Sequence, residues 1–234
     1  MLAIVLQARM DSSRLPGKSM LPLGGKPLIL RVMEALDRIP AELRVLACPE
    51  DSVSYFEKIV QEAGFTLFAG PKEDVLERFC LALKKFGIRH LIRATGDNPF
   101  VFADAAYALI TEALTLEADY AGYTGLPYGA GIEYVNAKAL LRAGTEATSE
   151  YEREHVCPYL YNHPEKFLLH RPLTSQHWQN PEIRLTVDTQ QDYDRAQALY
   201  AVLDRLEKSG KLSEGERYKG KAILSAHQEL GSRE

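Results

Sequence analysis

Three long cationic side chains lie in the first loop of the chain, in the segment QARMDSSRLPGKSMLPLGGKP. Arg9, Arg14 and Lys18 are spaced among residues that are largely Gly, Pro and Ser, directly after the apolar run LAIVL at 2–6. Cations and backbone N–H groups on one loop are suited to wrapping a triphosphate, and Gly17 would allow close approach of the main chain. A solvated basic surface loop is the alternative.

Two established phosphate-binding motifs do not fit this loop. The letters GKS at 17–19 resemble half a Walker A loop, but Ser12 stands where that pattern requires a glycine. The GxGxxG pattern of dinucleotide-binding proteins is also absent from the sequence. A triphosphate would therefore be held by a longer loop of another kind.

Two aspartates follow apolar segments at positions where they could bind a metal. Asp97 lies in RATGDNPF, between Gly96 and Pro99, and Asp188 ends the segment EIRLTVD. Mg²⁺ prefers hard oxygen ligands and is commonly held by one or two carboxylates together with phosphates and waters. Both aspartates have an alternative role, because each precedes a predicted helix that its side chain could cap.

The elements that must position these side chains alternate along the first half of the chain. Short apolar runs predict buried strands, and the segments between them have helical periodicity. The strands are expected at 2–6, 43–48, 65–70 and 90–95, and the helices at 28–39, 53–63, 75–86 and 103–116. This alternation predicts a three-layer α/β fold with a mostly parallel sheet, whose ligands bind at the carboxyl ends of the strands.

The second half is less regular and predicts a mixed sheet. ADYAGY, GIEYVN and EIRLTVD are candidate strands, EYEREHVCPYLYNHP indicates a helix up to Pro164, and 190–206 is a strongly amphipathic helix. We expect a single nucleotidyltransferase domain at 1–208, in which about 120–180 is a less regular acceptor or dimerisation portion. Residues 209–234 are expected to form a polar, partly helical C-terminal tail.

Composition restricts the partners. The 234 residues have a net charge of only −4, so no global basic field is available to attract a nucleic acid. The sequence shows no signal-peptide pattern and no apolar stretch that approaches the ~20 residues of a membrane span, which favours a cytoplasmic protein without membrane contact. Cys48, Cys80 and Cys157 lack the spacing of a zinc site or a redox pair, and are expected to be reduced thiols.

Several segments together resemble a known family. LQARMDSSRLPGKSMLPLGGKPLI, GPKEDVLERF, RATGDNPF, EYEREHVCPYLYNHPEKF and RLTVDTQQDYDRAQALY are similar, in the same order, to the cytidylyltransferases that activate acidic sugars, the sialic acid and KDO (3-deoxy-manno-octulosonic acid) synthetases. The similarity spans roughly residues 1 to 200 and is strongest to the branch known as spore coat polysaccharide biosynthesis protein F. It implies the nucleotide-diphospho-sugar transferase-like (Rossmann-like) fold.

The resemblance also implies roles for individual residues. The expected nucleotide-binding residues are Gln7, Ala8, Arg9, Ser13, Arg14, Lys18, Asp74 and Arg78; the expected catalytic residues are Arg14, Lys18 and Asp97; and the expected metal ligands are Asp97 and Asp188. Asp74 and Arg78 match a region near the base and ribose. An i, i+4 ion pair on a solvated helix face explains these two equally well.

The acceptor pocket is assigned through the segments EREHV and YGAGIEYVN. The resemblance places Arg153, His155 and Glu133 there, whereas Gly131 replaces an acidic residue that relatives commonly have, which leaves the acceptor undefined. The aromatic residues of YTGLPYG, together with Trp178, could form a wall for the acceptor. Ordinary aromatic packing is the alternative.

These features together predict an enzyme. The resemblance implies a Mg²⁺-dependent cytidylyltransferase that transfers CMP from CTP to an acidic sugar, releases pyrophosphate, serves surface polysaccharide biosynthesis and forms a homodimer. The first alternative is a non-catalytic nucleotide-binding partner of a glycan enzyme, which would not need both carboxylates. The second is a nucleotide-sugar glycosyltransferase, but no DxD metal motif ends a predicted strand.

Overall fold

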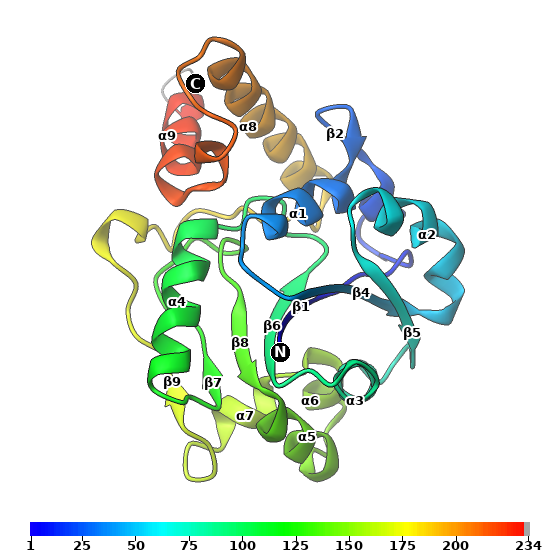
Figure 1. The fold of residues 1–234 in the computed structure, drawn as a ribbon. Helices are drawn as coiled ribbons and strands as arrows, with labels where there is room; N and C mark the ends of the chain where they lie inside the picture. The colour runs from blue at the N-terminus through cyan, green and yellow to red at the C-terminus, as the bar shows by residue number, and fades with distance from the viewer. Residues whose placement is uncertain (232–234) are drawn as a thin grey trace.

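A seven-stranded mixed sheet in the order β5–β4–β1–β6–β8–β7–β9 forms the centre of the computed structural model, which describes residues 1–231 (Figure 1). The strands are β1 (Leu2–Gln7), β4 (Leu43–Pro49), β5 (Thr66–Gly70), β6 (His90–Thr95), β7 (Tyr120–Ala121), β8 (Glu133–Asn136) and β9 (Leu169–His170). β5, β4, β1 and β6 are parallel neighbours, whereas β8 is antiparallel to both β6 and β7. The predicted three-layer α/β fold with a mixed, mostly parallel sheet is confirmed.

The central strand shows why two layers of helices are needed. Along β1, Ala3 and Val5 belong to one buried cluster, and Ile4 and Leu6 belong to the other. Because successive side chains of a strand point to opposite faces, an apolar run without alternation requires cover on both faces. The sequence LAIVL therefore places β1 in the interior of the sheet.

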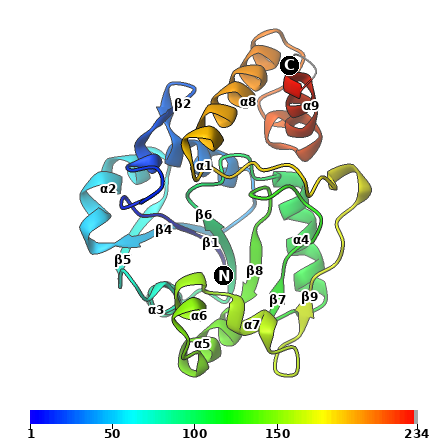
Figure 2. The same cartoon turned by 180° about the vertical axis from the view of Figure 1, so that it is seen from behind.

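The helices divide between these two faces, as the opposite views of Figures 1 and 2 show. One face carries α1 (Leu28–Asp37), α2 (Val53–Glu62), α4 (Ala103–Thr115), α8 (Gln190–Lys208) and α9 (Gly220–Gly231). The other carries α3 (Val75–Phe86), α5 (Ala137–Glu146) and α7 (Pro158–Asn162), with α6 (Glu150–His155) packed beside α3. Shorter elements are the β2–β3 hairpin (Pro22–Leu23 and Lys26–Pro27) and the 3-10 turns η1 (Lys18–Met20), η2 (Glu50–Ser52), η3 (Gln176–Trp178) and η4 (Glu216–Tyr218).

The predicted single helix in EYEREHVCPYLYNHP is broken into α6 and α7. Val156 has a positive φ of 74°, which turns the chain sharply after His155. The turn places Val156 and Cys157 in the core, with 0% and 1% exposure, whereas His155 stays at the surface. Burial of the next two residues thus overrides the helical periodicity of the sequence.

The segment EIRLTVD is extended but is not a strand of the sheet. Within it, only Arg184 has an isolated bridge partner, which is Tyr128. Its backbone N–H groups are used elsewhere: Leu185 donates to the Tyr128 carbonyl at 2.8 Å, and Val187 donates to the Asp97 carbonyl at 2.8 Å. The segment therefore links the loop that contains Tyr128 to the loop that contains Asp97, and does not add a strand to the sheet.

Beyond residue 208, the chain turns back along α8. Buried Arg217 donates to Asp204 and Glu207 of α8, and the Gly220 N–H donates to the Asp104 carboxylate of α4 at 2.9 Å. These contacts hold α9 against α8, at the far end from α3 and α5 in Figure 1. Within residues 1–231, no helix combines the length and apolar character needed to cross a bilayer.

Candidate active site

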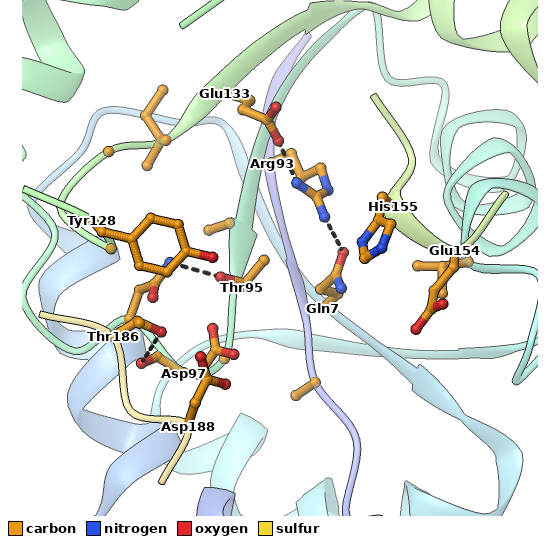
Figure 3. A pocket seen from close by; sticks show the side chains of 18 of the residues that line it. Gln7, Arg93, Thr95, Asp97, Tyr128, Glu133, Glu154, His155, Thr186 and Asp188 are labelled. Atoms are coloured by element: carbon orange, nitrogen blue, oxygen red, sulfur yellow. Dashed lines mark hydrogen bonds and ion pairs between the residues drawn. The ribbon is translucent and has the colours of Figure 1, made fainter. Parts of the chain in front are cut away.

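A cavity of about 760 Å³ opens where the first loop, the end of β6, the loop before β8 and the end of α6 meet. The carboxyl ends of the parallel strands β1 and β6 lie at this edge of the sheet, which is where ligands of such sheets are expected. Figure 3 shows the cavity with Asp97 and Asp188 close together, and with Arg93 directed at Gln7.

Asp97 is fixed at the end of β6 by the backbone around Gly96. The Gly96 N–H donates to the Gln7 carbonyl at 2.8 Å, and a Cβ on Gly96 would lie 2.9 Å from Ile29, 3.0 Å from Ala8 and 3.1 Å from that same carbonyl. A side chain here would require Ala8 and the Gln7 backbone to move by a few tenths of an ångström, so glycine is favoured. The Val187 N–H then binds the Asp97 carbonyl, which brings Asp188 beside Asp97.

Lys18 joins the two aspartates from the opposite side. Its Nζ lies 3.0 Å from Asp97 Oδ2, 3.0 Å from Asp188 Oδ1 and 2.9 Å from the Val187 carbonyl oxygen. The Lys18 side chain is only 13% exposed. The predicted catalytic lysine and both predicted metal ligands are therefore brought together, with one cation among three oxygens.

Asp188 has two further cationic partners. Arg14 Nη2 lies 3.0 Å from Oδ1, and Arg184 Nη2 donates to Oδ2 at 2.6 Å. Arg184 also donates to Asp192, and its guanidinium lies 4.8 Å from the centre of the Tyr128 ring. Arg184 was missed by sequence reasoning, although its position four residues before Asp188 is a usable signal.

Neither aspartate serves as a helix cap. Thr189 caps α8 and forms a capping box with Asp192, whereas the residue before α4 is Phe102, which has no side-chain capping bond. Burial raises the pKa of Asp192, but hydrogen bonds from Thr189, Arg195 and the Asp188 N–H outweigh it and lower this pKa to about 2. The capping alternatives for Asp97 and Asp188 are thus excluded by the geometry.

The nucleotide-binding residues predicted in the first loop all line the cavity: Gln7, Ala8, Arg9, Ser13, Arg14 and Lys18. Gly17 adopts φ 66° before η1, so the turn itself requires glycine. Arg9 is exposed and lies 4.0 Å from Asp11. The loop thus presents its cations toward one space.

The predicted pair Asp74 and Arg78 is divided between two places. Arg78 is 2% exposed, lines the cavity and donates to the Pro71 carbonyl, and burial lowers its pKa. Asp74 is not among the lining residues; it caps α3 and binds Arg153 Nε at 2.7 Å. The alternative of an exposed Asp74–Arg78 ion pair is therefore wrong.

Of the two acceptor residues predicted from EREHV, only one lies at the cavity. His155 lines the cavity and packs against Tyr151, with ring centres 4.4 Å apart and the ring planes tilted by 58°. Arg153 instead binds Asp74 and the carbonyls of Gly144 and Ala147, so its assignment to the pocket needs correction. It points to the other side of the short helix α6, where it ties α3 to α5.

Glu133 lines the cavity but has two strong partners. Its Oε1 accepts from the Tyr120 hydroxyl at 2.7 Å, and its Oε2 accepts from Arg93, which also donates to Gln7 Oε1 at 2.9 Å. This row of Tyr120, Glu133, Arg93 and Gln7 crosses β7, β8, β6 and β1, and Figure 3 shows its last three members. Burial and the charge of Glu133 raise the pKa of Tyr120, so this phenol stays a donor.

The aromatic wall forms only in part. Tyr123 and Tyr128 line the cavity, whereas buried Trp178 is not a lining residue and donates to Asp104 at 3.2 Å. Glu154, to which sequence reasoning gave no role, also lines the cavity, as do Arg93 and Arg171, which it missed. A charged residue inside the buried run HLIRAT was the available signal for Arg93.

The donor set around Lys18 Nζ is suitable for a divalent metal. Asp97, Asp188 and the Val187 carbonyl supply three hard oxygens, which already surround a cation in this structure. No group of three or more acidic, His or Cys side chains of the described chain forms a metal cluster. Two carboxylates are sufficient for Mg²⁺ when substrate phosphates and waters complete the shell.

The family model described as Cytidylyltransferase matches residues 3–225, which include every residue of the cavity. The chain belongs to the cytidylyltransferase family. Spore coat polysaccharide biosynthesis protein SpsF of Bacillus subtilis is 32% identical over 203 residues, which are 84% of this chain and 85% of SpsF. The 3-deoxy-manno-octulosonate cytidylyltransferase of Anaeromyxobacter sp. is 30% identical over 46% of this chain and 45% of its own.

Solved structures show the same fold. A cytidylyltransferase from Leptospira borgpetersenii superposes with a TM-score of 0.87 at 24% identity, and the alignment covers 99% of this chain and 95% of that one. A CMP:2-keto-3-deoxy-manno-octonic acid synthetase complexed with CTP gives a TM-score of 0.67 at 19% identity, with 86% and 98% covered. This cytidylyltransferase is therefore a nucleotidyltransferase with the nucleotide-diphospho-sugar transferase fold.

Proposed function

We propose that this cytidylyltransferase uses Mg²⁺ to transfer CMP from CTP to a sugar hydroxyl, with release of pyrophosphate, in surface polysaccharide biosynthesis. The observation that carries the proposal is the Asp97–Lys18–Asp188 cluster at the edge of one extended cavity. The cavity leaves room beside the cluster for both a nucleotide and an acceptor. The relatives named for polysaccharide and octulosonate chemistry support this choice of reaction.

The residues of the chain divide the work of such a transfer. The cations of the first loop, Arg9, Arg14 and Lys18, neutralise and orient the triphosphate, since phosphoryl-type transfer depends mainly on positioning and electrostatics. The carboxylates of Asp97 and Asp188 would hold the metal, which, when bound, polarises the α-phosphate and offsets charge on departing pyrophosphate. Arg78 offers a buried cation to the nucleotide from α3.

The acceptor occupies the end of the cavity beside β8 and α6 in this proposal. Glu133 and His155 line that end, whereas the exposed ring of Tyr128 lines the cavity on the side of Asp188 and Arg184. The sugar is an acidic one, a class supported by the octulosonate relatives and by Arg171, a lining cation that stacks on Tyr161. The two alternatives, a non-catalytic partner and a glycosyltransferase, have no observation that favours them.

The test is pyrophosphate release from CTP, UTP, ATP and GTP, with acidic and neutral sugars as acceptors and over a Mg²⁺ titration. We expect release only with CTP, Mg²⁺ and an acidic sugar. Equal release from ATP and CTP would remove the cytosine assignment, and release with neutral sugars alone would remove the acidic acceptor. The absence of release with every pair would favour the non-catalytic alternative.

We also propose that the protein acts as a two-fold homodimer, the commonest symmetry of soluble oligomers. Exposed Leu114, Leu116, Leu168 and Leu173 lie in α4 and its end and around the edge strand β9, an area that a second copy could cover. Light scattering at micromolar concentration should give twice the chain mass of 26.2 kDa. A mass of one chain would end this proposal.

A further inference from the structure

The ammonium group of Lys18 lies in a cradle of three oxygens at the centre of the site. Asp97 Oδ2 and Asp188 Oδ1 are each 3.0 Å from Nζ, and the Val187 carbonyl oxygen is 2.9 Å away. An ammonium has three N–H donors, so all of them are satisfied at once. The side chain is 13% exposed, and this arrangement is thus a nearly enclosed cation site that the chain fills by itself.

A divalent metal held by both Asp97 and Asp188 would need Asp188 Oδ1, which Lys18 binds, because Arg184 already holds Asp188 Oδ2. One oxygen cannot carry an ammonium and a metal in its direct ligand shell at the same position, so the two cations compete. The surroundings also disfavour an added charge, because Lys18, Arg14 and Arg184 face Asp188, and Lys18 also faces Asp97. The charges of the two carboxylates are already balanced without a metal.

We propose that Lys18 is a resident counter-ion, which occupies the metal position of the free protein and leaves it only when a triphosphate arrives. This inference rests on the proposed function, because it takes Asp97 and Asp188 as the metal ligands. In the free protein, Lys18 holds the two carboxylates together. When the triphosphate enters, its oxygens offer Lys18 a second set of acceptors, and the carboxylates become free to bind the metal that accompanies the nucleotide.

The position of Lys18 on the chain permits this exchange. It begins the 3-10 turn η1, directly after Gly17, and its four-carbon stem can redirect the ammonium without moving the backbone. Asp188 keeps its orientation meanwhile, because Arg184 holds Oδ2 at 2.6 Å. Oδ1 therefore stays directed at the vacated position.

The consequence is a binding order. A ligand that can bind only when Lys18 is displaced has its apparent affinity reduced by the fraction of molecules in which the position is free. If Lys18 occupies the cradle about nine-tenths of the time or more, the free protein binds a divalent ion about tenfold or more weakly than the carboxylates alone would. Metal and triphosphate should therefore enter together.

The test measures Mn²⁺ binding without acceptor, by electron paramagnetic resonance of free Mn²⁺ and by calorimetry. We compare the wild type with Lys18→Met and Lys18→Gln, each with and without CTP. Without CTP, either substitution should tighten Mn²⁺ binding about tenfold or more. In the wild type, CTP should tighten Mn²⁺ binding by a similar factor, and in the Lys18 variants by clearly less.

Lys72→Met is the matched control. Lys72 also lines the cavity and carries the same charge, but its ion pairs are with Asp11 at 2.7 Å and Asp51 at 2.8 Å. Removing a cation from the cavity without vacating the cradle should change Mn²⁺ binding by less than about twofold, as screened surface charges interact weakly. If Lys72→Met tightened Mn²⁺ binding as much as Lys18→Met, general electrostatics would explain the effect and the proposal would be overturned.

The remaining outcomes separate this inference from the proposed function. Wild type that binds Mn²⁺ as tightly without CTP as with it overturns the counter-ion role of Lys18 but leaves the metal site intact. The same role is overturned if both Lys18 variants are folded by circular dichroism and bind Mn²⁺ no better than the wild type. Should the variants not fold, a wild type whose Mn²⁺ affinity does not rise with CTP still overturns the role of Lys18.

Discussion

Asp188→Asn is the substitution that separates a metal ligand from a structural anchor. The carboxylate receives Lys18 and Arg14 on Oδ1 and Arg184 on Oδ2. An asparagine amide has one acceptor oxygen, and its NH₂ group must face one of these two sets of cations. In either orientation at least one cation loses its acceptor: Lys18 and Arg14 on one side, or the partly exposed Arg184 on the other.

The expected loss of stability is modest and can be estimated. A hydrogen bond to a charged group contributes about 1.5–3 kcal/mol. Because Arg14 and Arg184 are partly exposed, the expected loss in the free energy of unfolding is about 1–3 kcal/mol. For a chain of this length, that lowers the melting temperature by roughly 2–10 °C. A protein that starts with only about 5 kcal/mol of stability would still be about 97% folded at 25 °C after a loss of 3 kcal/mol.

Unfolding therefore cannot account for a large loss of turnover. Removing a major electrostatic stabiliser lowers turnover about 100-fold or more, so pyrophosphate release by Asp188→Asn should fall by at least that factor. Asp192→Asn is the matched control: it loses a partner of Arg184 and the capping box of α8, but Asp192 does not contact Lys18. It should lose similar stability and retain turnover within about tenfold, measured by thermal denaturation and pyrophosphate release. Asp188→Asn with wild-type turnover would refute this reasoning.

Three further predictions follow from other contacts. Arg184→Met should raise the Mg²⁺ concentration for half-maximal pyrophosphate release by about tenfold, because Asp188 loses its orientation, and Arg184→Lys should restore part of the loss. The pKa of Asp192 is lowered to about 2 in the fold, so its contribution to stability is complete above the unfolded pKa near 3.8 and disappears as the pH falls toward 2. The free energies of unfolding of wild type and Asp192→Asn, measured with urea, should therefore converge as the pH falls across that interval. Burial raises the pKa of Cys48 and of Cys80 to about 11, so a thiol reagent at pH 8 should label these cysteines only after denaturant is added.

The regular half of the fold could be predicted closely from the sequence. Expected helices at 75–86 and 103–116 correspond to Val75–Phe86 and Ala103–Thr115, because local signals agree with the hydrophobic period there. Asp74 caps the first of them, and Gly87, at φ 64°, ends it. Where local chemistry and burial favour the same boundary, sequence reasoning is sufficient.

The site could be predicted in its residue types but not in its pairings. Asp97, Lys18 and the other loop cations are found at the cavity, since each lies in the loop that follows β1 or β6. Sequence reasoning did not find that Arg153 turns away to hold Asp74, or that Arg184 orients Asp188. Such pairings depend on how segments far apart in the chain pack, and no local pattern encodes them.

The loop that carries Tyr128 has a consequence for protein engineering. Gly129 has φ 95°, and a Cβ there would lie 2.6 Å from the Thr186 nitrogen and 3.0 Å from Asn98 Oδ1. The Tyr128 carbonyl is bound by Leu185, so this short stretch is joined to the segment that carries Asp188. A redesign that lengthens or shifts the loop at 128–129 would move the carboxylate as well. Libraries aimed at a new acceptor should therefore keep 128–129 and Gly125, which has φ 83°, unchanged and vary the side chains of Tyr123, Thr124 and Leu126, where the same loop lines the cavity.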